Sequence, residues 1–472
     1  MQGIHTVEKI GGTSMSRFGE VMDNVIIGNR TGDALYHRIF VVSAYSGITN
    51  LLLEDKKNGA PGVYGHISND SPNWKTAFAK VRARMLEYNR QFESLGLDTV
   101  EADAFINQRL NEIETCLEDI MNLRTFGHFR PSDYLPATRE FLAAVGEVHS
   151  AYNSAKILQA HGVNARFLDL SGWKSTKSVT LDEAILNAFQ SVDLSQELPI
   201  VTGYVKFDSG IMKRFDRGYS EITFSKVAVL TEAAEGIIHK EFHLSTGDPK
   251  LIGVDKVEII GNTNFDIADQ LSDMGMEAIH SKAAKEMELK DIPIRVKNAF
   301  DPSHPGTLIS RDYISPHPRV EMICGRNDLL GIEMYDPEMV GEPGYDYRLT
   351  EHLNKYSINY IAKTTNANTI AHFVPEKSKR LSECIESIRK AFPTADVRPV
   401  KVGIVSVIGT NMRIPGFLSR ASSALFAAGI NVLALDQTLR QVNIQFVVDR
   451  ADFENAQKVL HHEFVEKLHE NN

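Results

Sequence analysis

The amino-acid sequence contains few cysteines and lacks any long apolar run. Its 472 residues include three cysteines, Cys116, Cys324 and Cys384, which are far apart and form no C-x-x-C spacing. This usage excludes a disulfide framework and a cysteine-rich zinc site, and it is typical of reduced thiols in the cytoplasm. No apolar run approaches the roughly 20 residues that span a bilayer. Residues 1–9 contain an acid and no apolar core of signal-peptide length, so we expect a cytoplasmic protein without a membrane partner.

An excess of positive charge is also missing. The chain has 51 lysines and arginines against 61 aspartates and glutamates, a net charge of −10. A general nucleic-acid binder needs a basic face that displaces counterions, so we expect no nucleic-acid partner. Two common glycine-rich nucleotide motifs, G-x-x-x-x-G-K-[ST] and G-x-G-x-x-G, are absent as well. A nucleotide would therefore be bound by another architecture.

What is present is an ordinary globular composition, with 43% hydrophobic and 24% charged residues, over a length that predicts two to four domains. The first part of the chain alternates short apolar runs with helical patterns, which favours an α/β sandwich around a parallel sheet. Strands are predicted at 39–42, 167–168, 200–202, 237–238, 257–260 and 292–296. Helices are predicted near 138–161, 182–191, 220–235, 266–275 and 280–289.

Two segments interrupt this alternation. Residues 72–124 are charged, periodic and nearly free of glycine and proline, which predicts a mainly helical insertion. Residues 298–319 contain four prolines, and such a density breaks regular structure. We therefore place a domain boundary there.

The sequence after this boundary repeats itself at an offset of 72 residues. Each copy reads as strand, glycine-ended loop, helix, strand, strand and helix, so each is a βαββα unit, and two copies could pair their sheets. Seven identities in one register favour a duplication over chance. The identities are Gly331 and Gly403, Ile332 and Ile404, Gly344 and Gly416, Arg348 and Arg420, Leu353 and Leu425, Ile358 and Ile430, and Asn359 and Asn431.

Two loops that follow strands could hold ligands. A short strand leads into Lys9 and then Gly11, Gly12, Thr13 and Ser14. Paired glycines let backbone N–H groups approach an anion, and a lysine adds the charge that phosphate sites use. A strand-end turn with a surface lysine explains this stretch equally well.

The second loop, residues 43–50, follows a buried strand at the end where open α/β sheets bind ligands. Ser43 and Thr49 are its candidate hydrogen-bonding residues. The alternative is a cluster that caps a helix.

Two charged positions stand out further along. Glu147 follows Gly146 in an otherwise apolar helical run, where it either points outward or meets a cationic ligand group. Arg217 could grip a carboxylate with two hydrogen bonds, and Ser220 fits the cap of an apolar helix whose first N–H groups favour an anion. A solvated charged loop is the alternative for the second stretch.

Together these four stretches resemble the aspartate kinase family of the amino-acid kinase fold, in order and spacing. Residues 9–14 resemble its K-F-G-G-T-S motif with Ile10 for Phe, 43–50 its S-A-x-x-G-x-T-N motif, 146–147 its Gly-Glu pair and 217–221 its R-G-G-S-D motif. The repeated tail resembles a tandem ACT pair.

This resemblance implies an α/β, three-layer αβα sandwich at 1–312, with a mainly helical insertion at about 72–124. Two ferredoxin-like ACT domains are implied at 320–394 and 400–472.

The resemblance also implies the reaction of ATP and L-aspartate, with Mg²⁺, to give ADP and 4-phospho-L-aspartate. Lys9, Arg217 and Glu221 are the implied catalytic residues; the identity of any metal ligand stays unknown. The implied nucleotide-binding residues are Lys9, Gly11, Gly12, Thr13 and Ser14, with Lys282 as a candidate. The implied aspartate-binding residues are Ser43, Thr49, Glu147, Arg217 and Ser220.

Besides Ile10, the sequence departs from the family pattern in further places. Glu221 replaces an aspartate and Tyr219 a glycine, and Glu277 replaces the lysine of a G-A-K-x-L-H-P motif. The aspartate-rich nucleotide loop is shortened to a loose match at 241–249. Lys282 or Lys297 could supply the missing charge. These departures resemble the branch associated with ectoine synthesis.

The ACT pair implies a homo-oligomer, dimer or tetramer, and an amino-acid effector, usually lysine or threonine. The product would serve lysine, threonine and methionine synthesis or ectoine synthesis. Two other functions stay open from the residues: another amino-acid kinase, or a non-catalytic amino-acid sensor that kept the fold.

Overall fold

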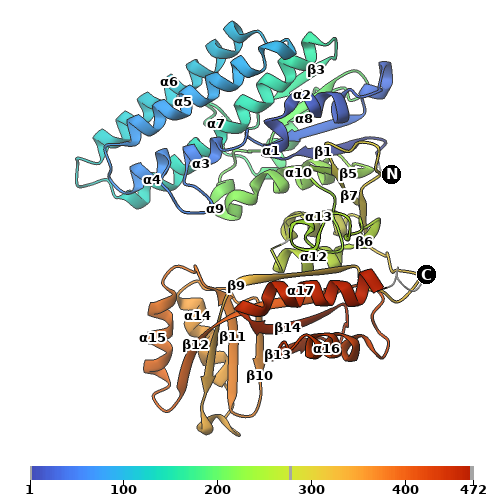
Figure 1. Ribbon diagram of the computed structural model, residues 1–472. Helices are drawn as coiled ribbons and strands as arrows, with labels where there is room; N and C mark the ends of the chain where they lie inside the picture. Colours follow the sequence, from blue (N-terminus) through green and yellow to red (C-terminus); the bar gives the residue numbers. More distant parts are fainter. Residues whose placement is uncertain (1–2, 276–278, 468–472) are drawn as a thin grey trace. The chain divides into compact units, whose positions relative to one another are not determined.

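The computed structural model describes residues 3–275 and 279–467, and the chain divides into two compact units (Figure 1). The first comprises Met1–His243 and Ile279–Arg311, and the second comprises Leu244–Ala278 and Asp312–Asn472. Residues 244–275 thus cluster with the C-terminal part of the chain. The three domain ranges expected from the sequence stay predictions.

A mainly parallel sheet forms the centre of the first unit. The strands that this unit contributes run in the order β3-β4-β2-β1-β5-β7-β8, and neighbours among them are parallel except β7 and β8. The central strands β1, β2 and β4 are buried almost throughout, as strands covered on both faces are. The strands are β1 (Thr6–Ile10), β2 (Arg38–Val42), β3 (Ala165–Leu168), β4 (Leu198–Thr202), β5 (Glu235–Lys240), β7 (Ile294–Asn298) and β8 (Thr307–Ser310).

Helices cover this sheet and complete the expected α/β sandwich. The long helix α7 packs on β3 and β4 with α6 beside it, whereas α10 packs on β1 and contacts α8 and α13 (Figure 1). Residues 72–124 contain α5 and α6. The helices are α1 (Gly12–Met15), α2 (Phe18–Val21), α3 (Ile48–Leu52), α4 (Val63–Ser68), α5 (Trp74–Gln91), α6 (Thr99–Leu123), α7 (Pro131–Ala160), α8 (Leu181–Phe189), α9 (Ile211–Phe215), α10 (Tyr219–Leu230) and α13 (Ser281–Leu289).

The second unit contains two βαββα repeats that share one antiparallel sheet. The order β10-β11-β9-β12-β14-β13 places the first strand of each repeat at the centre, where β9 pairs with β12. The pairing of two repeats through their sheets is therefore confirmed. The first repeat is β9 (Met322–Tyr335), α14 (Tyr345–Lys355), β10 (Ala362–Thr365), β11 (Thr369–Pro375) and α15 (Leu381–Ala391). The second is β12 (Asp396–Ile408), α16 (Phe417–Ala427), β13 (Val432–Gln437), β14 (Asn443–Asp449) and α17 (Phe453–His461).

Each repeat has its own hydrophobic core. Ile332, Leu349 and Ile388 belong to the first, and Val405, Phe446 and Leu460 belong to the second. The aligned glycines Gly344 and Gly416 both precede a helix with positive φ, 87° and 114°, which explains why the repeat retains glycine there.

The predicted strand at 257–260 is wrong. Among the described residues, this segment forms an isolated bridge between Ser245 and Ile259 rather than a strand, and the assigned strand is β6 (Asn262–Asn264). Ile259 is 40% exposed although Ile260 is buried. An apolar run does not show whether a segment has a neighbouring strand long enough to pair with it. Short helices α11 (Pro249–Ile252) and α12 (Phe265–Asp273) flank it.

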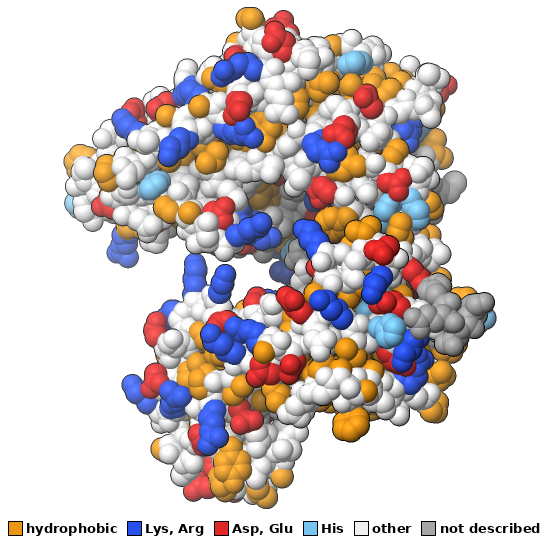
Figure 2. Space-filling view, in the orientation of Figure 1, with side chains coloured by type: hydrophobic (Ala, Val, Ile, Leu, Met, Phe, Trp, Pro, Cys, Tyr) orange, Lys and Arg blue, Asp and Glu red, His pale blue; other side chains and the backbone are white. Residues whose placement is uncertain are grey.

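Charged side chains of both signs are interspersed over the face of the first unit that Figure 2 shows. No helix among the described residues is both long and apolar enough to cross a membrane.

Candidate active site

Three loops meet at the carboxyl ends of β1, β2 and β4, and glycines make the close approach possible. A Cβ at Gly12 would lie 2.6 Å from the Ala44 carbonyl oxygen, and one at Gly146 would lie 2.9 Å from the Ala44 Cβ. A Cβ at Gly203, after β4, would lie 3.0 Å from Glu147 Oε2. Larger residues would push these loops apart, so the glycines set the spacing of the site.

Lys9, near the end of β1, forms an ion pair with Glu221 of α10. The Lys9 Nζ lies 3.1 Å from Glu221 Oε1, and both side chains are largely buried. Glu221 Oε2 accepts a hydrogen bond from the backbone N–H of His280, which caps α13. Burial would raise the pKa of Glu221, but the charges of Lys9 and Lys240 and these hydrogen bonds hold it below its usual value. Glu221 therefore stays ionised and holds the Lys9 side chain at the loop ends.

Glu147 of α7 is buried and only half satisfied. Its Oε1 accepts a 2.8 Å hydrogen bond from Ser220 Oγ, whereas Oε2 has no hydrogen-bond partner among the described residues. Burial raises its pKa to about 8, although the Ser220 hydrogen bond and the charge of Lys9 oppose the rise. A buried carboxylate in this state favours a cationic ligand group.

Arg217 lies in the turn before α10, and its guanidinium is also half satisfied. Its Nη2 donates a 2.7 Å hydrogen bond to Asn50 Oδ1 of α3, and the Asn50 amide in turn donates to Asp55. Its Nη1 is buried without a hydrogen-bond partner in the described part of the chain. An anion at Nη1 would complete its hydrogen bonds.

The first glycine loop, with Gly11 and Gly12, forms the turn that leads from β1 into α1. Of the described residues, the His239 carbonyl oxygen alone lies within 4 Å of a Cβ built on Gly11, at 3.9 Å, so this side of the loop is not filled by them. Ser14 is buried and donates a 3.2 Å hydrogen bond to Glu241. Thr13 lies between them in the same helical turn.

The remaining predicted residues take different positions. The Ser43 backbone follows β2 and accepts a hydrogen bond from Ser150, and Thr49 is the second residue of α3. The Lys282 ammonium group lies 5.6 Å from the centre of the Phe215 ring. The neighbouring contact to Glu221 comes from the backbone N–H of His280. Lys297 lies near the end of β7. Glu277 lies outside the described residues.

A contact that sequence reasoning missed comes from the helical insertion. The Tyr88 hydroxyl of α5 donates to the Ser46 carbonyl at 3.1 Å and lies 3.0 Å from Ser16 Oγ. Ser16 Oγ accepts from the Ser46 N–H at 2.8 Å and donates to the Gly12 carbonyl. These bonds tie the first two loops together. No motif marks Tyr88, because the contact joins distant segments.

Comparison with known proteins explains this arrangement. The model of the amino acid kinase family matches residues 5–298, and an ACT domain model matches residues 405–464. Aspartate kinase Ask_Ect of Stutzerimonas stutzeri is 47% identical over 465 residues, which cover 98% of each chain. The chain belongs to the aspartate kinase family.

More distant aspartate kinases also match this chain over most of its length. Aspartokinase 1 of Arabidopsis thaliana is 25% identical over 98% of this chain and 81% of the relative. The structure of E. coli aspartokinase III in complex with aspartate and ADP matches with a TM-score of 0.73 and 20% identity, covering 97% of this chain and 99% of that one. The Clostridium acetobutylicum aspartate kinase gives 0.71 and 20%, covering 97% and 100%. These likenesses establish a common fold over the whole chain.

Proposed function

We propose that this chain is an aspartate kinase that transfers the γ-phosphoryl group of ATP to the side-chain carboxylate of L-aspartate. Its full-length identity of 47% to an aspartate kinase carries this proposal. The half-satisfied Glu147 and Arg217 support it, because together they offer the opposite charges that an amino acid presents.

In this proposal Glu147 Oε2 receives the ammonium group of aspartate, and Arg217 Nη1 receives a carboxylate. Ser43, Thr49 and Ser220 complete the aspartate site with hydroxyl groups. The ammonium group would ionise Glu147, because a nearby positive charge offsets the desolvation that raises its pKa.

Lys9 and the backbone of Gly11, Gly12, Thr13 and Ser14 would hold the transferring phosphate, with Lys282 as a further candidate. A β-carboxylate oxygen of aspartate forms a bond to the γ-phosphorus, while the bond to the β–γ bridging oxygen breaks and ADP leaves with that electron pair. The attacking carboxylate is already ionised, so no general base is needed. Lys9 stabilises charge on the phosphate oxygens, and Glu221 holds Lys9 in place.

The residues beside the glycine loop fit Mg²⁺. The Ser14 hydroxyl and the Glu241 carboxylate lie in contact there, and both are hard oxygen ligands of the kind that Mg²⁺ accepts together with phosphates. Bound Mg²⁺ would neutralise charge on the phosphates.

The two repeats would bind an amino-acid effector such as lysine or threonine and join subunits into a homo-oligomer. An effector acts only through its different affinities for two states of the enzyme. The similarity to Ask_Ect favours a place in ectoine synthesis over lysine, threonine and methionine synthesis.

A hydroxamate assay with ATP, Mg²⁺ and a panel of amino acids tests the reaction. We expect acyl phosphate with L-aspartate alone. Acyl phosphate from another amino acid would instead indicate a different amino-acid kinase. Amino-acid binding without any acyl phosphate would indicate a non-catalytic sensor.

A further inference from the structure

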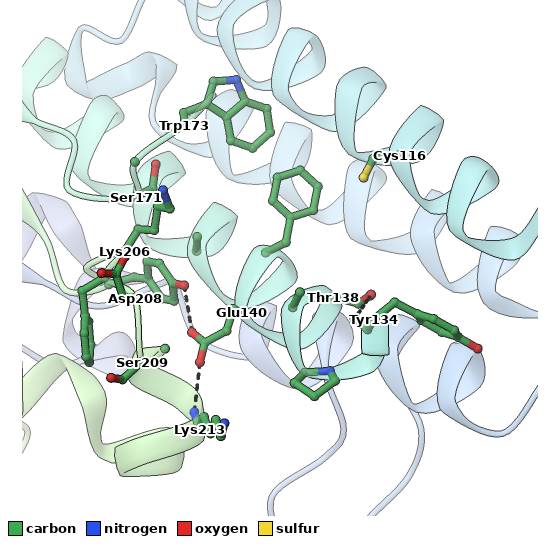
Figure 3. A pocket seen from close by; sticks show the side chains of 18 of the residues that line it. Cys116, Tyr134, Thr138, Glu140, Ser171, Trp173, Lys206, Asp208, Ser209 and Lys213 are labelled. Atoms are coloured by element: carbon green, nitrogen blue, oxygen red, sulfur yellow. Dashed lines mark hydrogen bonds between the residues drawn. The ribbon is translucent and has the colours of Figure 1, made fainter. Parts of the chain in front are cut away.

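A cavity of about 650 Å³ lies in the first unit, apart from every residue assigned above to aspartate or ATP. Helices α6, α7 and α9 and the loops at 171–174 and 204–210 form its walls (Figure 3). Its volume falls in the range of pockets that hold small molecules.

Aromatic rings form one apolar wall of this cavity. Trp173 stacks on Phe141 with ring centres 5.2 Å apart and planes 13° from parallel. The indole N–H donates a 2.9 Å hydrogen bond to Glu112, and the guanidinium of Arg109 lies 4.4 Å from the Trp173 ring centre. The rings are thus held in place before any ligand arrives, which lowers the entropy cost of binding to them.

Glu140, two helical turns before Glu147, places a carboxylate in the cavity with neutral partners only. Its Oε2 accepts from the Tyr204 hydroxyl at 2.8 Å and its Oε1 accepts from the Lys213 backbone N–H at 2.9 Å (Figure 3). A Cβ at Gly210 would lie 2.5 Å from Glu140 Oε1, so glycine is needed there. No lysine, arginine or histidine of the described residues lies within ion-pair distance of Glu140.

Two further groups in the wall have hydrogen bonds to give. Lys213 lines the cavity and forms no ion pair within the described part of the chain. Ser171 is 7% exposed, and its Oγ has no partner among the described residues. The other two lysines of the wall are committed, because Lys174 pairs with Glu112 and Lys206 donates to backbone carbonyls.

We propose that this cavity binds a free α-amino acid with a large apolar or aromatic side chain. Glu140 contacts the Lys213 backbone at one end of the cavity, so a carboxylate and a lysine side chain belong to the same part of the wall, as an amino acid carries its ammonium and carboxylate groups at one end. The side chain would lie along Phe141 and Trp173, and the Ser171 hydroxyl would add a hydrogen bond. Such a site differs from the aspartate site in residues and in the chemistry of the side chain it takes.

Isothermal titration of the full-length protein with L-phenylalanine, at saturating L-aspartate, tests this proposal. A ligand of this size predicts one site with a Kd of about 0.05–1 mM. We expect Glu140→Gln to weaken binding at least about tenfold, because it removes the charge that pairs with the ammonium group. Phenylacetate, which lacks that group, should not bind.

Phe141→Leu and Phe105→Leu form a matched pair. Phe105 stacks on Tyr152 at 3.7 Å in the same helical layer but does not line the cavity. We expect the first substitution to weaken binding and the second to leave it unchanged. Absence of binding up to about 10 mM would overturn the proposal. So would wild-type affinity in Phe141→Leu, a result that stays decisive even if Glu140→Gln does not fold.

Discussion

Two buried glutamates of the first unit have opposite environments. Glu8 of β1 and Glu147 of α7 are each 2% exposed. Glu8 lies 2.6 Å from Arg38 Nε on β2 and 2.7 Å from His239 Nε2 on β5, so it joins three neighbouring strands. Glu147 Oε1 accepts a hydrogen bond from the Ser220 hydroxyl, whereas its Oε2 has no hydrogen-bond partner among the described residues. The first carboxylate is satisfied within the protein and the second is not.

This difference separates a structural charge from a charge kept for a ligand. Burial would raise the pKa of Glu8, but Arg38 and His239 hold it well below its usual value. Burial of Glu147 meets no comparable opposition, and its pKa rises to about 8. The protein therefore satisfies the Glu8 carboxylate in the middle of the sheet and leaves the Glu147 carboxylate of α7 incompletely hydrogen-bonded where we place aspartate.

Lys9→Ala removes a charge from the proposed active site, where Glu147 also lies, and should have the largest effect on activity. We expect kcat to fall by about 10³-fold with little change in the aspartate KM, because Lys9 acts mainly on the phosphate in the transition state. Steady-state kinetics measures both constants. The exposed pair of Lys75 and Glu118 supplies the control, and Lys75→Ala should leave kcat unchanged. An unaltered kcat in Lys9→Ala would refute the role.

Glu8→Gln removes the charge of the carboxylate that is satisfied within the protein. We expect a loss of about 3–5 kcal/mol in the free energy of unfolding at pH 7, because the charge of Arg38 stays buried without its partner. Urea unfolding measures this loss. Since the folded pKa of Glu8 is depressed, its contribution is present above the unfolded value near 4.5 and is lost as the pH falls.

The surface pair of Glu101 and the half-buried Lys156 gives the control for this loss. Glu101→Gln should cost less than about 1 kcal/mol. Equal losses in the two variants would remove the distinction between the buried network and an ordinary surface pair.

Glu147→Gln should raise the aspartate KM about 10- to 100-fold while kcat falls less. The wild-type carboxyl, with a pKa near 8, is mostly neutral at pH 7, and the ammonium group of aspartate favours its ionised form. Aspartate binding should therefore release close to one proton at pH 7. Calorimetry in buffers of different ionisation enthalpy measures this release, which Glu147→Gln should abolish.

The same shift sets the sign of a stability effect without aspartate. The folded pKa of Glu147 lies above its unfolded value, so its contribution is fully present below about pH 4.5 and is lost as the pH rises through 8. Glu147→Gln should accordingly stabilise the ligand-free protein more at pH 8.5 than at pH 5. A larger gain at pH 5 would contradict the assigned environment.

Several elements of this fold could be predicted from the sequence because local patterns specify them. The offset between Gly344 and Gly416 revealed two repeats, since each glycine stands at a helix start with positive φ. The apolar run at 39–42 became the buried strand β2. The strand predicted on the same grounds at 257–260 is wrong, because a strand also requires a pairing partner, which the apolar pattern does not reveal.

The candidate site was predictable in its motifs but not in its pairing. Lys9, Glu147 and Arg217 were singled out from local residues, yet the partners of Lys9 and Arg217, Glu221 and Asn50, emerge only when distant segments meet. Tyr88 had no local signal, since its hydroxyl acts on a loop 42 residues away in sequence. Long-range side-chain contacts of this kind depend on the packed fold.

Tyr88→Phe removes this one hydroxyl and should have the smallest effect. The ring keeps its stacking on Tyr45, whose centre lies 4.5 Å away, so the fold should survive. Losing the bonds to Ser46 and Ser16 weakens the connection between two loops of the proposed site, although the direct bond between Ser16 and Ser46 remains. We therefore expect kcat to fall about three- to tenfold, in line with one or two neutral hydrogen bonds. Steady-state kinetics and thermal unfolding measure the two effects separately.

Tyr152→Phe is the matched control, because its hydroxyl bonds to Glu101 in the same helical layer but touches neither loop. Both substitutions remove one phenolic hydroxyl, so a general loss of helix packing would affect the two variants alike. A positioning role predicts a lower kcat in Tyr88→Phe only, and Ser16→Ala should reproduce much of that loss without adding to it. Equal kcat values in the two tyrosine variants would mean that the helical insertion has a purely structural role. Its hydrogen bonds would then stabilise the fold, as those of Glu8 do, and would not position the loops of the proposed site.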